Sequence, residues 1–95
     1  MIVRLVKMQL REDAVDAFAA MFAARRARIA GFPGCLHLEL WHDAAGAPVF
    51  YTYSHWESEA ALNHYRFSEF FKETWTLTKT FFAAKAEAVT LVRAA

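Results

Sequence analysis

The chain has 95 residues, which is near the commonest size of one domain, and 57% of them are hydrophobic, so it can build a core. Its 11 basic and 10 acidic residues nearly cancel, and a single short arginine cluster at 25–28 argues against a nucleic-acid partner. The single cysteine excludes an internal disulfide and indicates a reducing, cytoplasmic setting. No signal-peptide pattern and no apolar run of about 18 residues is present, so we expect no membrane partner. We predict one domain over residues 1–95.

The first third of the chain predicts a strand followed by a helix. Residues 2–9 are rich in β-branched and long apolar side chains, which is typical of a strand. Residues 11–30 repeat apolar side chains at roughly helical spacing, with acidic residues in the first turn and arginines near the end, as the helix dipole favours. The Gly-Phe-Pro-Gly run at 31–34 predicts the end of that helix.

The remainder predicts two strands, a helix and a last strand. Residues 35–42 alternate strictly, with Leu36, Leu38 and Leu40 on one face. After a small-residue loop, the predicted elements are an aromatic strand at 49–55, a helix from 57 to about 79 with a possible break before Phe81, and a strand at 87–93. The order β-α-β-β-α-β predicts a ferredoxin-like α+β fold, an antiparallel sheet with its helices on one face.

The second face of the strand at 35–42 carries Cys35, His37, Glu39 and Trp41. A face exposed to water should be richer in Lys, Glu, Thr and Ser, because Trp and Cys seldom prefer water. We therefore predict a homodimer in which a second sheet covers this face, with a modest exposed apolar patch as the alternative. His37 and Glu39 share this face and are expected to form a hydrogen-bonded pair. No third ligand accompanies the histidines, so no metal site is predicted.

Two runs carry a resemblance to a known family. The run FPGC at 32–35 and the run YSHWES at 53–58, which leads into Ala61, Leu62 and His64, resemble the antibiotic biosynthesis monooxygenase domain. The resemblance implies a dimeric α+β barrel with a pocket between sheet and helices in each subunit. It also implies three kinds of activity among members. Some oxygenate phenols, quinols or polycyclic aromatics with dioxygen and without metal or flavin, others degrade haem, and others have no known activity.

Six residues are candidates for the pocket. Trp56 matches the family's Trp and would hold a flat substrate by stacking, or would serve only as a core aromatic. His64 lies eight residues later, near a helical stripe that also holds Phe71 and Trp75, and would accept or relay a proton, unless it is a structural histidine. The remaining candidates, which would contact a substrate oxygen, are Thr52 and Tyr53.

The leading functional hypothesis is a monooxygenase that uses no cofactor and acts on a small electron-rich aromatic molecule. The alternative is a dimeric module that binds a small ligand or has a structural role without turnover. A haem-degrading activity is less favoured, because Val6 and Lys7 stand where that branch has an Asn and Trp75 stands where its iron-ligating His would fall.

Overall fold

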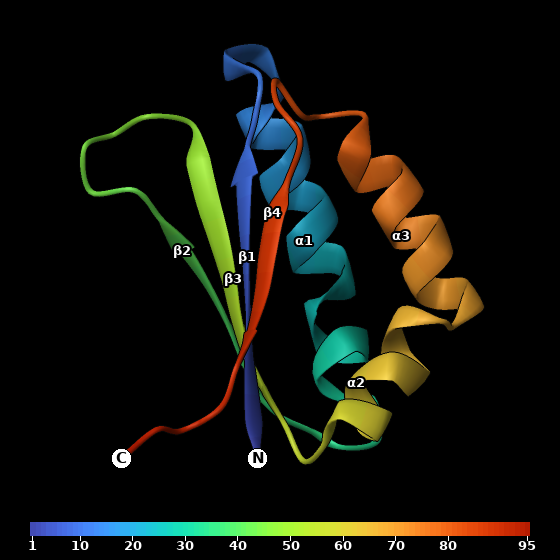
Figure 1. Ribbon diagram of the computed structural model, residues 1–95. Helices are drawn as coiled ribbons and strands as arrows, with labels where there is room; N and C mark the ends of the chain where they lie inside the picture. The colour runs from blue at the N-terminus through green and yellow to red at the C-terminus, as the bar shows by residue number, and fades with distance from the viewer.

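Four antiparallel strands form one sheet, and helices cover one of its faces (Figure 1). The computed structural model describes all of residues 1–95. In chain order the elements are β1 (Ile2–Gln9), a short 3₁₀ turn (Glu12–Ala14), α1 (Val15–Ala30), β2 (Cys35–His42), β3 (Val49–Trp56), α2 (Glu59–Arg66), α3 (Glu69–Lys79) and β4 (Glu87–Leu91). The predicted strands are confirmed to within two residues at their ends.

The strands lie in the order β2-β3-β1-β4, so the predicted ferredoxin-like α+β fold is confirmed. In the central pair, Arg4 lies opposite Ser54 and Val6 opposite Thr52. Residues directly opposite each other in an antiparallel pair share a face, and the side chains of these four line the space under the helices. The intervening residues of each strand form the open face of the sheet. None of the helices is both long and apolar enough to cross a membrane.

The tightest part of the core lies where β1 ends over α1. Met8, Leu10, Phe18 and Met21 form a buried cluster. The ring of Phe18 lies 5.3 Å from that of Phe50 on β3, so α1 is fixed against the middle of the sheet. Burying a side chain such as Phe18 contributes about 2–3 kcal/mol, so this cluster secures one end of the two-layer structure.

The prediction of one continuous helix from residue 57 to about 79 was wrong, because the structure has two helices in this segment. α2 ends at Arg66 and α3 begins at Glu69. Between them, Ser68 adopts an extended backbone, and its hydroxyl accepts a hydrogen bond from the Phe71 N–H at 3.1 Å. A serine in that position caps a new helix, so the chain changes direction there, in addition to the predicted break before Phe81, where α3 ends at Lys79.

The strict alternation predicted for 35–42 is interrupted by a β-bulge. Cys35 lies opposite Trp56 and His37 opposite His55, which leaves Leu36 as the extra residue. As a result Leu36 is 53% exposed instead of buried in a leucine row, and Cys35 shares the helix-facing side with Trp56. The open face therefore keeps His37, Glu39 and Trp41 but not Cys35.

Gly34 sets the approach of α2 to the start of β2, and its replacement tests this packing. Gly34 has φ +86°, and an added Cβ would overlap the Cβ of Ala61. Gly46 has φ +80° but open space around it, so it is the matched control. Gly46→Ala should cost about 1–2 kcal/mol of unfolding free energy, the usual penalty of left-handed backbone for a residue with a Cβ. Gly34→Ala should cost clearly more in urea unfolding. Equal losses would contradict the close packing of α2.

Candidate functional site

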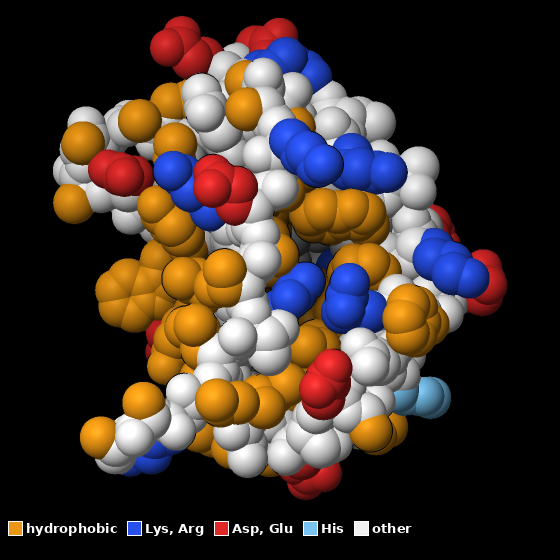
Figure 2. All heavy atoms as spheres, viewed as in Figure 1, with side chains coloured by type: hydrophobic (Ala, Val, Ile, Leu, Met, Phe, Trp, Pro, Cys, Tyr) orange, Lys and Arg blue, Asp and Glu red, His pale blue; other side chains and the backbone are white.

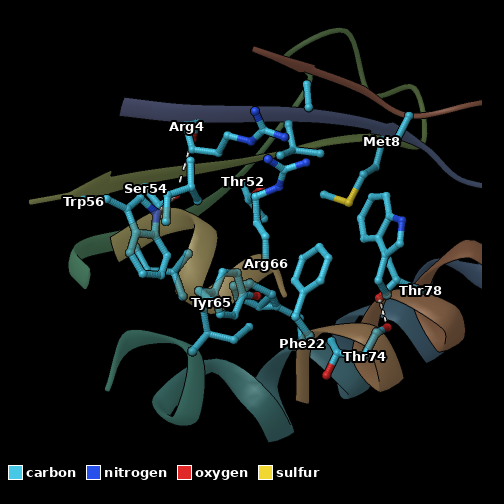
Figure 3. A pocket seen from close by; sticks show the side chains of 18 of the residues that line it. Arg4, Met8, Phe22, Thr52, Ser54, Trp56, Tyr65, Arg66, Thr74 and Thr78 are labelled. Carbon is cyan, nitrogen blue, oxygen red and sulfur yellow. Dashed lines mark hydrogen bonds between the residues drawn. The ribbon is translucent and has the colours of Figure 1, made fainter. Parts of the chain in front are cut away.

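A cavity of about 260 Å³ lies between the helix-facing side of the sheet and the helices. Val6, Met8 and Thr52 contribute to its wall from the strands, while side chains of α1, α2 and α3 complete it (Figure 3). Its lining is predominantly apolar and aromatic. This volume is slightly below the ~300 Å³ at which drug-sized pockets begin, so it suits a molecule of one or two rings.

Trp56 is both a core residue and a wall of the cavity. Its side chain is 1% exposed, and its indole Nε1 donates a hydrogen bond to Ser54 Oγ at 3.0 Å. The indole stacks on the ring of Tyr65, with centroids 5.1 Å apart and an interplanar angle of 22°. The hydrogen bond fixes the edge of the indole and the stacking fixes its face, so the ring is held rigidly beside the cavity.

An aromatic row continues from Tyr65 along α3. The ring of Phe71 meets Tyr65 edge-on at 5.0 Å and stacks on Trp75 at 5.9 Å. Burial raises the pKa of the Tyr65 hydroxyl, with a smaller contribution from Cys35. Tyr65 therefore stays protonated at neutral pH and can only act there as a hydrogen-bonding group or an apolar surface. The sequence analysis did not select Tyr65, although it lies three residues after the buried Leu62 and so on the same helix face.

Four of the six predicted site residues come together in the cavity wall: Thr52, Trp56, Phe71 and Trp75. The Thr52 hydroxyl makes no hydrogen bond within the chain. Tyr53 lies opposite Leu5 and Glu39 on the open face of the sheet, away from the cavity.

His64 is exposed and does not line the cavity. Its ring lies 6.3 Å from that of Phe32. The predicted stripe through Trp56, His64 and Trp75 assumed one continuous helix. Trp56 is instead the last residue of β3, so helical spacing does not connect it with His64. Within α2 the buried Leu62 marks the inward face, and His64, two residues later, lies about 200° around the helix on the outer surface. No histidine, aspartate or glutamate lines the cavity.

The charged groups of the cavity are two arginines that the sequence analysis did not select. Arg4 lies on β1, and Arg66 is the last residue of α2. The available signal was the position of Arg4 between Ile2 and Val6, where strand alternation places its side chain on the helix-facing side. The other polar side chains of the wall all carry hydroxyls: Thr52, Ser54, Tyr65, Thr74 and Thr78.

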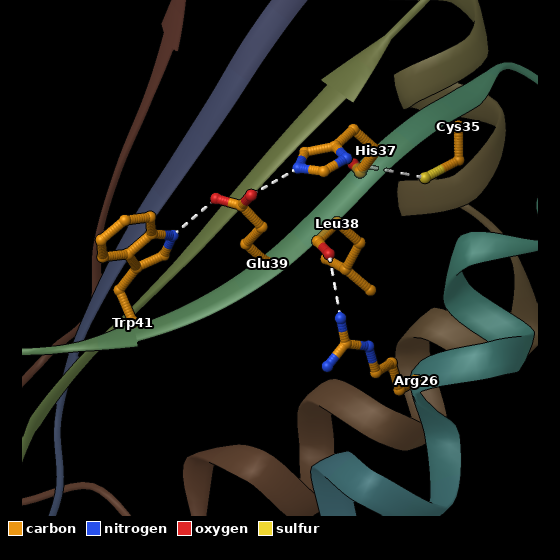
Figure 4. A network of polar contacts seen from close by, with 6 residues as sticks. All are labelled: Arg26, Cys35, His37, Leu38, Glu39 and Trp41. Carbon is orange, nitrogen blue, oxygen red and sulfur yellow. Dashed lines mark hydrogen bonds and ion pairs between the residues drawn. The ribbon is translucent and has the colours of Figure 1, made fainter.

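A second polar group lies on the open face of the sheet (Figure 4). His37 Nε2 lies 2.6 Å from Glu39 Oε2, and Trp41 Nε1 donates to Glu39 Oε1 at 2.7 Å. The expected pairing of His37 with Glu39 is thus present. The hydrogen bonds from His37 and then Trp41 lower the pKa of the Glu39 carboxyl. No group of three or more His, Cys, Asp or Glu side chains forms a metal-binding cluster.

The hydrogen bond between Trp56 and Ser54 gives a test of the rigid wall. Ser54→Ala should leave the buried indole N–H without an acceptor and cost about 1–3 kcal/mol in urea unfolding. In a Trp56→Phe background the same change should cost much less, because no donor remains to be satisfied. A Ser54→Ala penalty of equal size in both backgrounds would contradict the proposed fixing of the indole.

The comparisons with known proteins agree with this arrangement. The family model described as antibiotic biosynthesis monooxygenase matches residues 1–76. No protein with a curated description matches the sequence. A solved structure described as an antibiotic biosynthesis monooxygenase superposes with a TM-score of 0.92 at 18% identity, covering 100% of both chains.

Two further solved structures share the fold. A putative antibiotic biosynthesis monooxygenase from Nitrosomonas europaea gives a TM-score of 0.87 at 17% identity, with 100% of each chain covered. A variant of SnoaB, a cofactor-independent oxygenase from Streptomyces nogalater, gives 0.87 at 15% identity over 99% of this chain and 93% of its own. Since the family model covers most of the chain, this protein belongs to the antibiotic biosynthesis monooxygenase family.

Proposed function

We propose that this protein is a monooxygenase that uses no cofactor and acts on a small electron-rich aromatic substrate, such as a phenol, a quinol or a small polycycle. The observation that carries the proposal is the cavity of about 260 Å³ whose walls include Trp56, Tyr65, Phe71 and Trp75. Flat aromatic walls favour a flat aromatic occupant, because stacked and edge-on ring contacts add to the burial of apolar area. Membership of the family and the fold shared with a cofactor-independent oxygenase support the same reading.

In this reaction the protein mainly positions the substrate, because the substrate itself supplies the electrons. An ionised phenol or quinol is electron-rich enough to reduce dioxygen itself, so the protein must orient the ring, favour its ionisation and exclude water. Trp56 is fixed by its hydrogen bond and its stacking, and so would hold the ring in one orientation. The free hydroxyl of Thr52, in the cavity wall, would contact a substrate oxygen.

One observation favours the second candidate, a binding module without turnover. The cavity has no histidine or carboxylate to accept a proton, and His64 lies outside it. The same lack of an imidazole means that the cavity offers no histidine ligand to haem iron. Turnover therefore depends on ionisation of the substrate without a protein base.

Oxygen uptake with a panel of quinols and polyphenols separates the two candidates. At least one compound should be oxidised faster than in buffer without protein. Thr52→Val, which keeps the side-chain shape, should lower this rate about tenfold, the equivalent of one lost hydrogen bond. Thr76→Val, an exposed residue of α3 outside the cavity, is the matched control and should leave the rate unchanged. If no compound exceeds the protein-free rate, the binding module takes the place of the enzyme.

We also propose that the protein acts as a homodimer joined through the open face of the sheet. Trp41 is 59% exposed there, and Val89 and Leu91 on the edge strand are each 48% exposed. Burying such a face contributes about 25 cal/mol for each Å² of apolar area, a useful amount for a domain of this size. The occupant is a second copy of the same face, since it presents apolar side chains around a centrally bonded Glu39.

Sedimentation tests the dimer. The wild type should sediment at twice its chain mass of 10.8 kDa at micromolar concentration. Leu91→Lys should give a folded monomer, because a charge would be buried in the interface. Phe67→Lys is the matched control, as Phe67 is 68% exposed but lies between α2 and α3. A wild-type monomer, or a Leu91→Lys dimer as tight as the wild type, would contradict the proposed interface.

A further inference from the structure

Two arginines converge on the cavity from different elements. Arg4 extends from β1 and Arg66 from the end of α2, and Figure 3 shows both side chains reaching the space near Thr52. In the space-filling view, Lys and Arg side chains lie within the hydrophobic hollow between the sheet and α3 (Figure 2). Burial lowers the pKa of Arg4, and the nearby charge of Arg66 lowers it further. The two positive charges are therefore close enough to repel each other.

Neither arginine has a negative partner. The four ion pairs of the protein all involve other residues. Arg4 Nη1 donates to the neutral hydroxyl of Thr90 at 2.8 Å. The guanidinium of Arg66 lies 6.0 Å from the ring centroid of Phe67. Partly buried charges are usually paired, and two adjacent like charges in an apolar cavity are unfavourable until an anion joins them.

We propose that Arg4 and Arg66 form an anion site that binds the ionised oxygen of a phenol or quinol. The inference rests on the proposed function, since it takes the aromatic substrate as given and assigns how that substrate is ionised. The O–H bond of the substrate breaks, its proton passes to water, and the electron pair stays on the oxygen between the two guanidinium groups. Arginine suits this task because it stays charged and presents several N–H donors to one oxygen.

An anion site would also explain how the substrate ionises in a cavity that has no histidine or carboxylate to accept its proton. A positive charge within about 4–6 Å lowers the pKa of an acidic group by roughly 1–3 units. Two such charges oppose the effect of the apolar wall, so the phenolate is a larger fraction of the bound than of the free substrate at neutral pH. A side chain that accepts the proton is then unnecessary, and the position of His64 outside the cavity is no obstacle to the reaction.

A coloured phenol measures this effect without any turnover. The phenolate of 4-nitrophenol is yellow and the phenol is not, so an absorbance titration reports its pKa when bound. 4-Nitroanisole has the same ring but no acidic proton, and its binding by calorimetry reports the aromatic cavity alone. Bound 4-nitrophenol should show a pKa at least one unit below that of the free compound. Arg4→Gln and Arg66→Gln should each remove about half of this shift, because the other charge remains, while both variants still bind 4-nitroanisole.

Arg93→Gln is the control for the lost charge, since Arg93 is exposed and outside the cavity, and it should keep the full shift. Binding of both compounds with an unchanged pKa would overturn the anion site and leave the aromatic cavity standing. An undiminished shift in both arginine variants would overturn its assignment to these residues. Failure of both compounds to bind would overturn the proposed function together with this inference.

Discussion

The stacking of Trp56 on Tyr65 is the contact on which the site depends. It joins the end of β3 to the last turn of α2, so the first helix after β3 is fixed to the sheet. Because Tyr65 is held there, the next residue, Arg66, reaches the cavity and the chain then turns at Ser68. The position of α3 over the sheet follows from that turn. Loss of the contact between Trp56 and Tyr65 would therefore displace both Arg66 and the aromatic side chains of α3.

The two faces of the sheet have different chemistry, and strand alternation separates them. On β1, Arg4 and Val6 face the cavity while Leu5 faces the opposite side, and on β3 the same rule separates Thr52 from Tyr53. The cavity side combines positive charge with aromatic walls, which suits an anionic aromatic molecule. The open side combines exposed apolar residues with an internally satisfied polar group, which suits a second copy of the protein.

Alternation and turn residues were enough to predict the strands and their order from the sequence. The prediction was weaker where one side chain overrides the periodicity. Ser68 caps a new helix in the middle of an apparently continuous pattern, and Trp56 belongs to β3 instead of to that pattern, so helical spacing wrongly placed His64 beside it. The bulge at Leu36 likewise reversed the side on which Cys35 lies. Both effects arise from local backbone geometry, which hydrophobic spacing does not report.

The candidate site was predictable in its aromatic part and not in its charged part. Thr52, Trp56, Phe71 and Trp75 could be selected because a resemblance or a helical spacing pointed to them. Arg66 lies at the end of an exposed-looking helix, and its approach to Arg4 depends on the long-range packing of α2 against β3, through Trp56 and Tyr65. Only the folded arrangement brings those charges together in one cavity.

The most direct test of a ligand cavity walled by tryptophans is an NMR titration of the three indole N–H groups with 4-nitroanisole. The signals of Trp56 and Trp75 should shift together with one affinity, because both rings line the cavity. The signal of Trp41 on the open face should stay in place. A shift confined to Trp41, or no shift at any of the three, would contradict the account.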